Sequence, residues 1–106
     1  MNSQLKKGAL ELCVLATLST KECYGYELVS ILSKGIQITD GTIYPLLKRL
    51  KDDGYVETYL KETSGGPPRK YYVITEKGIK EKQALQEEWT DFIKGVNMIL
   101  EGDSND

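Results

Sequence analysis

Hydrophobic residues in the first third of the chain recur every three or four positions, which is the spacing of an amphipathic helix. The first such segment covers residues 4–18 and is apolar round much of its surface, as in a helix that is buried on two sides. The second covers residues 24–34 and ends at Gly35, since glycine often follows the last turn of a helix. The pattern therefore predicts two helices joined by a polar turn at residues 19–23.

A third helix is predicted to follow Thr39, because threonine is a common N-cap residue, and to end at Gly54. Pro45 removes one hydrogen bond near the start of this helix, so we expect a slight kink or a tight first turn there. The apolar residues of the segment share one face and should be buried: Ile43, Leu46, Leu47 and Leu50.

The hydrophobic pattern then changes to a period of two. Residues 55–62 and 69–75 alternate in the manner of strands, and the turn-forming residues TSGGPP lie between them at 63–68. We therefore expect a β-hairpin with a flexible tip.

A long helix is predicted from about Thr75, and its large apolar residues are spaced four, three, four and three positions apart. This is the 3.5-residue repeat of a coiled-coil seam. The alternative is packing within the chain, but the seam is too apolar to face water, and a single helix after a complete small domain has little left to pack on. We therefore predict a homodimer, in which the first helix completes an interface formed by Leu85, Trp89, Phe92, Val96 and Ile99.

The order of these elements predicts an α+β fold that is mostly helical. Three helices and a hairpin form a winged helix-turn-helix domain at residues 1–75, and a long dimerisation helix with a frayed tail follows at residues 76–106. In such domains the third helix enters the major groove of DNA and the hairpin flanks the backbone.

The formal net charge of −2 hides an uneven distribution. Residues 1–75 carry ten Lys or Arg against eight Asp or Glu, whereas residues 76–106 carry four against eight. The acidic excess is therefore confined to the predicted dimerisation helix and tail, and the net charge does not argue against DNA binding.

The composition argues against most enzyme classes. The chain has no histidine, the commonest general base and zinc ligand, and Cys13 and Cys23 do not form a CxxC motif. We expect no catalytic residue, no metal site and no cofactor. The longest apolar run, Leu12 to Leu18, is too short to cross a bilayer, so we expect a cytoplasmic protein with no membrane partner.

A family resemblance that covers nearly the whole chain is carried by four strings: KKGALELCVLATL, YGYEL, GTIYPLLKRLKDDGYV and GGPPRKYYVITEKG. At these separations they resemble the PadR family of bacterial transcriptional regulators. In length the chain resembles the small subfamily with a single C-terminal helix, similar to multidrug-responsive repressors. The resemblance implies a winged-helix homodimer that represses transcription until a small molecule or another signal relieves the repression.

The resemblance places the tyrosine of the GTIYPLL string, Tyr44, on the DNA side of the third helix. Thr42 and Tyr44 are then candidates for hydrogen bonds to a phosphate or a base edge, and Lys48 is a candidate for a phosphate contact. The alternative is that Tyr44 packs on a neighbouring helix and that Lys48 is merely solvated.

Two further groups complete the predicted DNA-binding residues. In the hairpin, Gly66 would let the backbone approach a phosphate closely, and Arg69 and Lys70 supply positive charge on opposite faces of the strand. Lys6 and Lys7 lie at the start of the first helix, where the helix dipole disfavours cations, which hints at a nearby anion. The alternatives are a solvated hairpin turn and two solvated lysines.

Trp89 is the only tryptophan of the chain. In multidrug-responsive members of the family, a tryptophan at the matching place in the last helix lines a cavity between subunits and stacks on flat aromatic ligands. The resemblance therefore implies a ligand-binding role for Trp89, with a flat aromatic effector as partner and acidic neighbours such as Glu88 or Asp91 to suit a cation. The alternative is that Trp89 only anchors the dimer interface.

Two hypotheses for function follow. In the first, the protein is a sequence-specific repressor that binds double-stranded operator DNA and is released by a small-molecule effector bound near the dimer interface. In the second, it is a winged-helix dimer that binds other proteins and has lost DNA binding. A contiguous face formed by Tyr44, Lys48, Arg69 and Lys70 would favour the first hypothesis.

Overall fold

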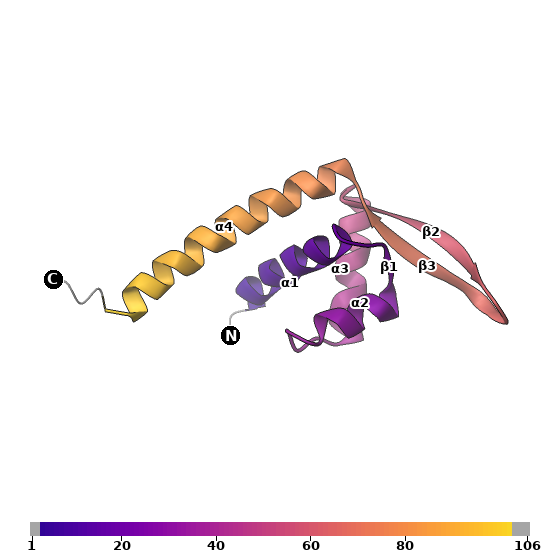
Figure 1. Ribbon diagram of the computed structural model, residues 1–106, viewed down its shortest axis with the longest axis horizontal. Coiled ribbons are helices and arrows are strands. Elements are labelled where there is room, and N and C mark those ends of the chain that lie inside the picture. Colours follow the sequence, from indigo (N-terminus) through magenta and orange to yellow (C-terminus); the bar gives the residue numbers. More distant parts are fainter. Residues whose placement is uncertain (1–2, 103–106) are drawn as a thin grey trace.

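The computed structural model describes residues 3–102, and side chains from Lys7 onward. Within these residues the chain forms an α+β fold of four helices and a three-stranded antiparallel sheet (Figure 1). The elements, in chain order, are α1 (Ser3–Leu18), β1 (Cys23–Tyr24), α2 (Gly25–Leu32), α3 (Asp40–Asp52), β2 (Val56–Thr63), β3 (Gly66–Ile74) and α4 (Glu76–Leu100). The predicted order of helices, hairpin and long final helix is confirmed.

The sheet contains one strand that the sequence pattern did not predict. The strands lie in the order β1-β3-β2, and β1 pairs antiparallel with β3 through Cys23 opposite Tyr72 and Tyr24 opposite Tyr71. Residues 19–23 were expected to be a turn, and that is wrong at Cys23. A two-residue strand shows no alternation, so only its partner in space reveals it.

The hairpin of β2 and β3, hereafter the wing, is tighter than expected. Thr63 pairs with Gly66, so that only Ser64 and Gly65 remain as the turn. Gly65 has a φ of 79°, a left-handed conformation that glycine adopts at little cost, as two-residue hairpin turns require. The expectation of a flexible loop over residues 63–68 is therefore wrong for most of that segment.

Two prolines lie inside β3 because the strand is irregular there. Lys61 pairs with Arg69, while Thr63 pairs with Gly66, so β3 contains one more residue than β2 between these two pairs. Such a bulge interrupts the ladder of backbone hydrogen bonds. Proline has no N–H to donate, so Pro67 and Pro68 are tolerated at this point of the strand.

The core lies where α1, α2 and α3 meet the base of the sheet. All four apolar residues predicted for the buried face of α3 are buried. Cys23 is fully buried beside them, and Cys13 is half-buried at the edge of the core. The fully or nearly buried residues are Leu10, Val14, Leu15, Leu18, Cys23, Leu28, Leu32, Ile43, Leu46, Leu47, Leu50, Val56 and Tyr72.

The final helix, α4, starts beside the wing and runs past α1, and its C-terminal half extends away from the rest of the chain (Figure 1). Its first turn is capped by Thr75, whose hydroxyl accepts a hydrogen bond of 3.0 Å from the backbone N–H of Gly78. The same hydroxyl donates to the carbonyl of Gly54, just past the end of α3. The start of α4 is thereby attached directly to the end of α3.

Candidate nucleic-acid interface

The exposed face of α3 lies opposite its buried stripe and carries the three residues predicted to meet DNA. Thr42 is exposed, and its hydroxyl lies 3.2 Å from that of Thr39, the N-cap residue. The Lys48 side chain is 77% exposed and forms an ion pair of 3.0 Å with Asp52, four residues further along the helix. An exposed pair of this kind contributes only about 0.3–0.5 kcal/mol, so the ammonium group can exchange this partner for a phosphate.

Tyr44 combines the two roles that the sequence left open. Its ring packs against Gly25, the first residue of α2, so closely that a Cβ atom on residue 25 would lie 2.7 Å from Cε1 of the ring. Tyr44 is nevertheless 42% exposed. The tyrosine is therefore held by α2 while its outer part faces solvent.

A groove of about 370 Å³ lies where the start of α2, the first half of α3 and the middle of β3 meet. It brings together three of the predicted residues: Tyr44 from α3, and Arg69 and Lys70 from β3. The other lining residues are Tyr24, Gly25, Tyr26 and Tyr72. We call this the tyrosine groove.

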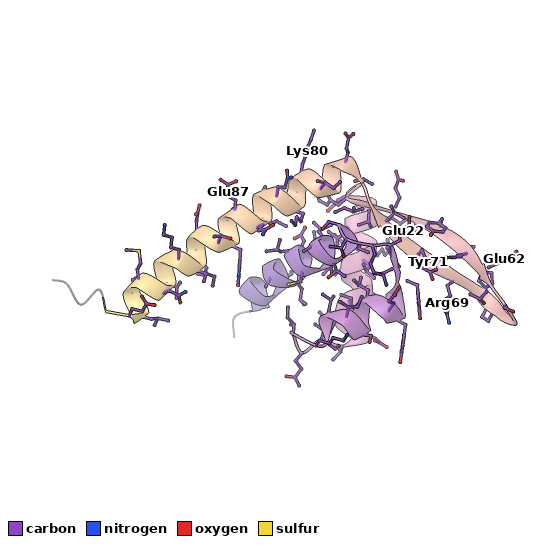
Figure 2. All side chains as sticks on the ribbon, viewed as in Figure 1. Glu22, Glu62, Arg69, Tyr71, Lys80 and Glu87 are labelled. Atoms are coloured by element: carbon purple, nitrogen blue, oxygen red, sulfur yellow. The ribbon has the colours of Figure 1, made fainter. Side chains whose placement is uncertain are left out.

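The wall of the tyrosine groove on the wing side is formed by a cation held against an aromatic ring. The guanidinium carbon of Arg69 lies 4.4 Å from the ring centroid of Tyr24, a distance at which the cation and the ring attract. Arg69 projects from the wing on the side where α2 lies (Figure 2). Arg69 and Lys70 are neighbours in β3, paired with Lys61 and Leu60, and strand alternation predicted that they would point to opposite faces. Both nevertheless line the tyrosine groove.

Four other predicted DNA-binding residues, Lys7, Thr42, Lys48 and Gly66, do not line the groove, so the face expected from Tyr44, Lys48, Arg69 and Lys70 is brought together without Lys48. Gly66 is exposed at the tip of the wing, and Lys7 is exposed at the start of α1. The side chain of Lys6 lies outside the described residues.

Tyr26 also lines the tyrosine groove, where it is 74% exposed, although no sequence pattern predicted a role for it. It belongs to the YGYEL string, which contributed to the family resemblance but was given no role at the DNA. Helical periodicity separates buried from exposed positions, but it cannot tell a tyrosine that lines a groove from one that is simply solvated.

A second hollow, of about 220 Å³, lies between α1 and α4. Its apolar residues come from both helices, so the first half of α4 packs on α1 within the chain, which is the alternative to a dimer seam for this part of the helix. The rings of Trp89 and Phe92 lie 6.4 Å apart on its α4 side. Glu88 also lines it, whereas Asp91 is exposed and does not. The lining residues are Gly8, Ala9, Leu12, Leu85, Glu88, Trp89 and Phe92.

The predicted seam of α4 is partly covered in the single chain and most exposed at its C-terminal end. Phe92 is 52% exposed and Ile99 is 80% exposed, while Leu85, Trp89 and Val96 are half-buried. No helix within residues 3–102 has the length and apolar content of a membrane span.

Comparison with known proteins agrees with this geometry. A sequence model for the PadR-like family of transcriptional regulators matches residues 14–86, from the middle of α1 to the middle of α4. The chain belongs to the PadR-like family. Its members are transcriptional regulators rather than enzymes, and they bind DNA and typically dimerise.

Solved PadR-like proteins resemble the chain over nearly its full length. A PadR-like transcriptional regulator from Bacillus cereus is 41% identical, with a TM-score of 0.83 over 94% of this chain and 99% of its own. A PadR-like transcription factor from Bacteroides fragilis is 37% identical, with a TM-score of 0.78 over 92% of this chain and 95% of its own. A curated but uncharacterised protein from Lysinibacillus sphaericus is 30% identical over 96% of this chain and 97% of its own length.

Proposed function

We propose that this PadR-family regulator is a repressor that binds operator DNA as a homodimer in the cytoplasm and releases it when an effector binds near the dimer interface. The DNA-binding part of the proposal rests on the groove between α3 and the wing, which is lined by Tyr44, Arg69 and Lys70. Two cations in a groove beside α3 favour a negatively charged partner, as DNA is.

On the DNA side, α3 enters the major groove and the wing follows the backbone. Thr42 and Tyr44 then donate hydrogen bonds to phosphate oxygens or base edges, and Lys48 contacts a phosphate. Arg69 and Lys70 add phosphate contacts from the wing, and the bare backbone at Gly66 allows the wing tip to approach closely. Lys6 and Lys7, at the start of α1, add a further phosphate contact.

The dimer forms through α4, with α1 completing the interface. The exposed seam residues Phe92 and Ile99 support this assignment, because such side chains face water only at a cost. Burying each large apolar side chain contributes about 1.5–3 kcal/mol. In the domain organisation that we propose, residues 1–75 read DNA and residues 76–106 join two subunits at a separation that suits two half-sites.

The effector site is the hollow between α1 and α4. Trp89 offers a flat aromatic face there, and Glu88 lines the same hollow with a carboxylate that favours a cationic ligand. We therefore propose a flat aromatic effector that stacks on Trp89 and alters the position of α4 relative to the partner subunit.

Fluorescence anisotropy of a labelled duplex taken from the DNA directly upstream of this protein's own gene tests the proposal. We expect a Kd of about 10 nM or tighter, selectivity over a scrambled duplex, and a steep loss of affinity between about 50 and 200 mM salt. Quenching of Trp89 fluorescence, the only tryptophan signal, then reports effector binding. Failure to exceed nonspecific binding on any operator recovered by genome-wide pull-down would favour the protein-interaction hypothesis instead.

A further inference from the structure

We infer that the tyrosine groove binds a single phosphodiester of the DNA backbone, and that Tyr26 donates a hydrogen bond to it together with Tyr44, Arg69 and Lys70. The inference rests on the proposed DNA-binding function. It adds Tyr26 to the DNA-binding residues, and it assigns one phosphate to four side chains from three different elements. Thr42 and Lys48 are left to contact other parts of the DNA.

The charge of the groove favours a negatively charged ligand. The chain as a whole is acidic, with a formal net charge of −2, yet the seven residues that line the groove are four tyrosines, one glycine, one arginine and one lysine. None of these described lining residues is a carboxylate. A cavity walled by two cations and no anion attracts a negative ligand.

The hydrogen-bonding groups of the groove favour a ligand that accepts hydrogen bonds. Arginine and lysine only donate hydrogen bonds, and a tyrosine hydroxyl can donate one. A phosphodiester carries only acceptor oxygens on its phosphate, so it suits a wall of donors, whereas a base edge presents donors as well. Gly25, the first residue of α2, also lines the groove, and the positive end of the α2 dipole therefore lies beside it.

Two of the donors are already held in place. The guanidinium carbon of Arg69 lies over the ring of Tyr24, 4.4 Å from its centroid, and Tyr44 is packed against Gly25. A guanidinium group stacked on a ring keeps its edge free for a bidentate contact with a phosphate. Tyr26 is 74% exposed at the same groove, which leaves its hydroxyl accessible to the DNA.

One consequence is that the phosphate would connect the wing to the helices. Tyr26 belongs to α2, Tyr44 to α3, and Arg69 to β3. A phosphate bound by all three therefore fixes the wing relative to α2 and α3. Phosphate contacts of this kind position a protein on the duplex and carry no sequence information themselves.

The test uses the full-length protein and its operator, with single phosphates replaced by uncharged methylphosphonates at symmetry-related positions in the two half-sites. Tyr26→Phe removes only the exposed hydroxyl. It should weaken binding to the unmodified operator about tenfold for each subunit, the effect of one lost charge-assisted hydrogen bond, and therefore about a hundredfold for the dimer. Arg69→Ala should weaken it at least as much. On the duplex that lacks the charge of the relevant phosphate, the difference in affinity between wild type and Tyr26→Phe should shrink, because the hydrogen bond from the hydroxyl is no longer assisted by a negative charge.

Tyr55→Phe is the matched control, because it also removes one tyrosine hydroxyl, from a residue that does not line the groove. It should bind the unmodified operator as wild type does and should keep the wild-type sensitivity to every methylphosphonate. Wild-type affinity in Tyr26→Phe, or different critical phosphates for Tyr26 and Arg69, would overturn this inference while leaving the DNA-binding function intact. A wild-type protein that binds no duplex above background would instead overturn both.

Discussion

The ring of Tyr44 lies in the space that a side chain on residue 25 would occupy. A Cβ atom there would meet Cε1 of the ring at 2.7 Å and the hydroxyl oxygen at 2.9 Å. The glycine of the YGYEL string and the tyrosine of the GTIYPLL string are therefore two halves of one contact between α2 and α3. This contact determines where Tyr44 lies at the edge of the tyrosine groove.

The first prediction concerns Gly25→Ala, which should displace Tyr44 and weaken operator binding about tenfold or more. Overpacking of this kind typically costs about 1–3 kcal/mol, so the melting temperature should fall by several degrees. Gly35→Ala is the matched control, because a Cβ on Gly35 meets nothing within 4 Å. Anisotropy and thermal melts report both effects, and a Gly25→Ala protein with wild-type affinity would show that the position of Tyr44 is irrelevant to DNA binding.

A second prediction compares two glycines of α4. A Cβ on Gly78 would lie 2.1 Å from the backbone oxygen of Tyr55, whereas one on Gly95 would meet nothing within 4 Å. Gly78→Ala should therefore separate the start of α4 from the wing and strongly destabilise the fold. Gly95→Ala should instead stabilise the protein by about 0.5–1 kcal/mol, as alanine replaces glycine inside a helix. Urea unfolding of both variants tests this, and equal effects would contradict the close contact at Gly78.

Most of the fold could be predicted from the sequence because its elements are strongly periodic. The stripe of α3 and the seam of α4 each extend over several turns, and patterns of that length distinguish a helix from a strand without tertiary information. The details that were missed depend on partners in space. The pairing of Cys23 with Tyr72 and the two-residue turn at Gly65 are set by strand register, which a local pattern does not contain.

The candidate site could be predicted in part, for a related reason. Tyr44 came from the family resemblance, and Arg69 and Lys70 came from their charge beside a turn. Tyr26 was missed because its role depends on a groove formed by three elements that are separate in the chain. The structure shows how these elements meet, and the role proposed for Tyr26 follows from that arrangement.

The third prediction uses Lys48 to test the proposed contact between α3 and DNA. Each lost phosphate contact lowers the slope of log K against log salt by about 0.9, so Lys48→Ala should lower it by about 1.8 in a dimer. Loss of the exposed ion pair with Asp52 should barely alter stability. Lys80→Ala, on the side of α4 that faces away from α1 (Figure 2), is the control and should keep the wild-type slope. An unchanged slope in Lys48→Ala would place Lys48 outside the interface.

The fourth prediction concerns the acidity of Cys23. Burial raises the pKa of this thiol above its usual value of 9.0, so the folded state favours the neutral thiol. The stabilisation is fully present below that value and is lost as the pH rises through the higher folded pKa, because the unfolded chain ionises first. The melting temperature of wild type should therefore fall more between about pH 8 and about pH 10 than that of Cys23→Ala. Parallel curves for the two proteins would show that Cys23 does not contribute.

The last prediction tests the dimer through Phe92, which is 52% exposed in the single chain and lies on the hollow shared by α1 and α4. Phe92→Asp would place a charge in the middle of the proposed interface, where burial of a charge without a partner is very costly. We expect light scattering to report a monomer at micromolar concentration and operator affinity to fall with it, because two half-sites are no longer read together. Gln83→Asp introduces the same carboxylate at an exposed position of α4 outside the seam and should remain a dimer. A Phe92→Asp protein that stays dimeric would mean that the subunits meet through some other surface.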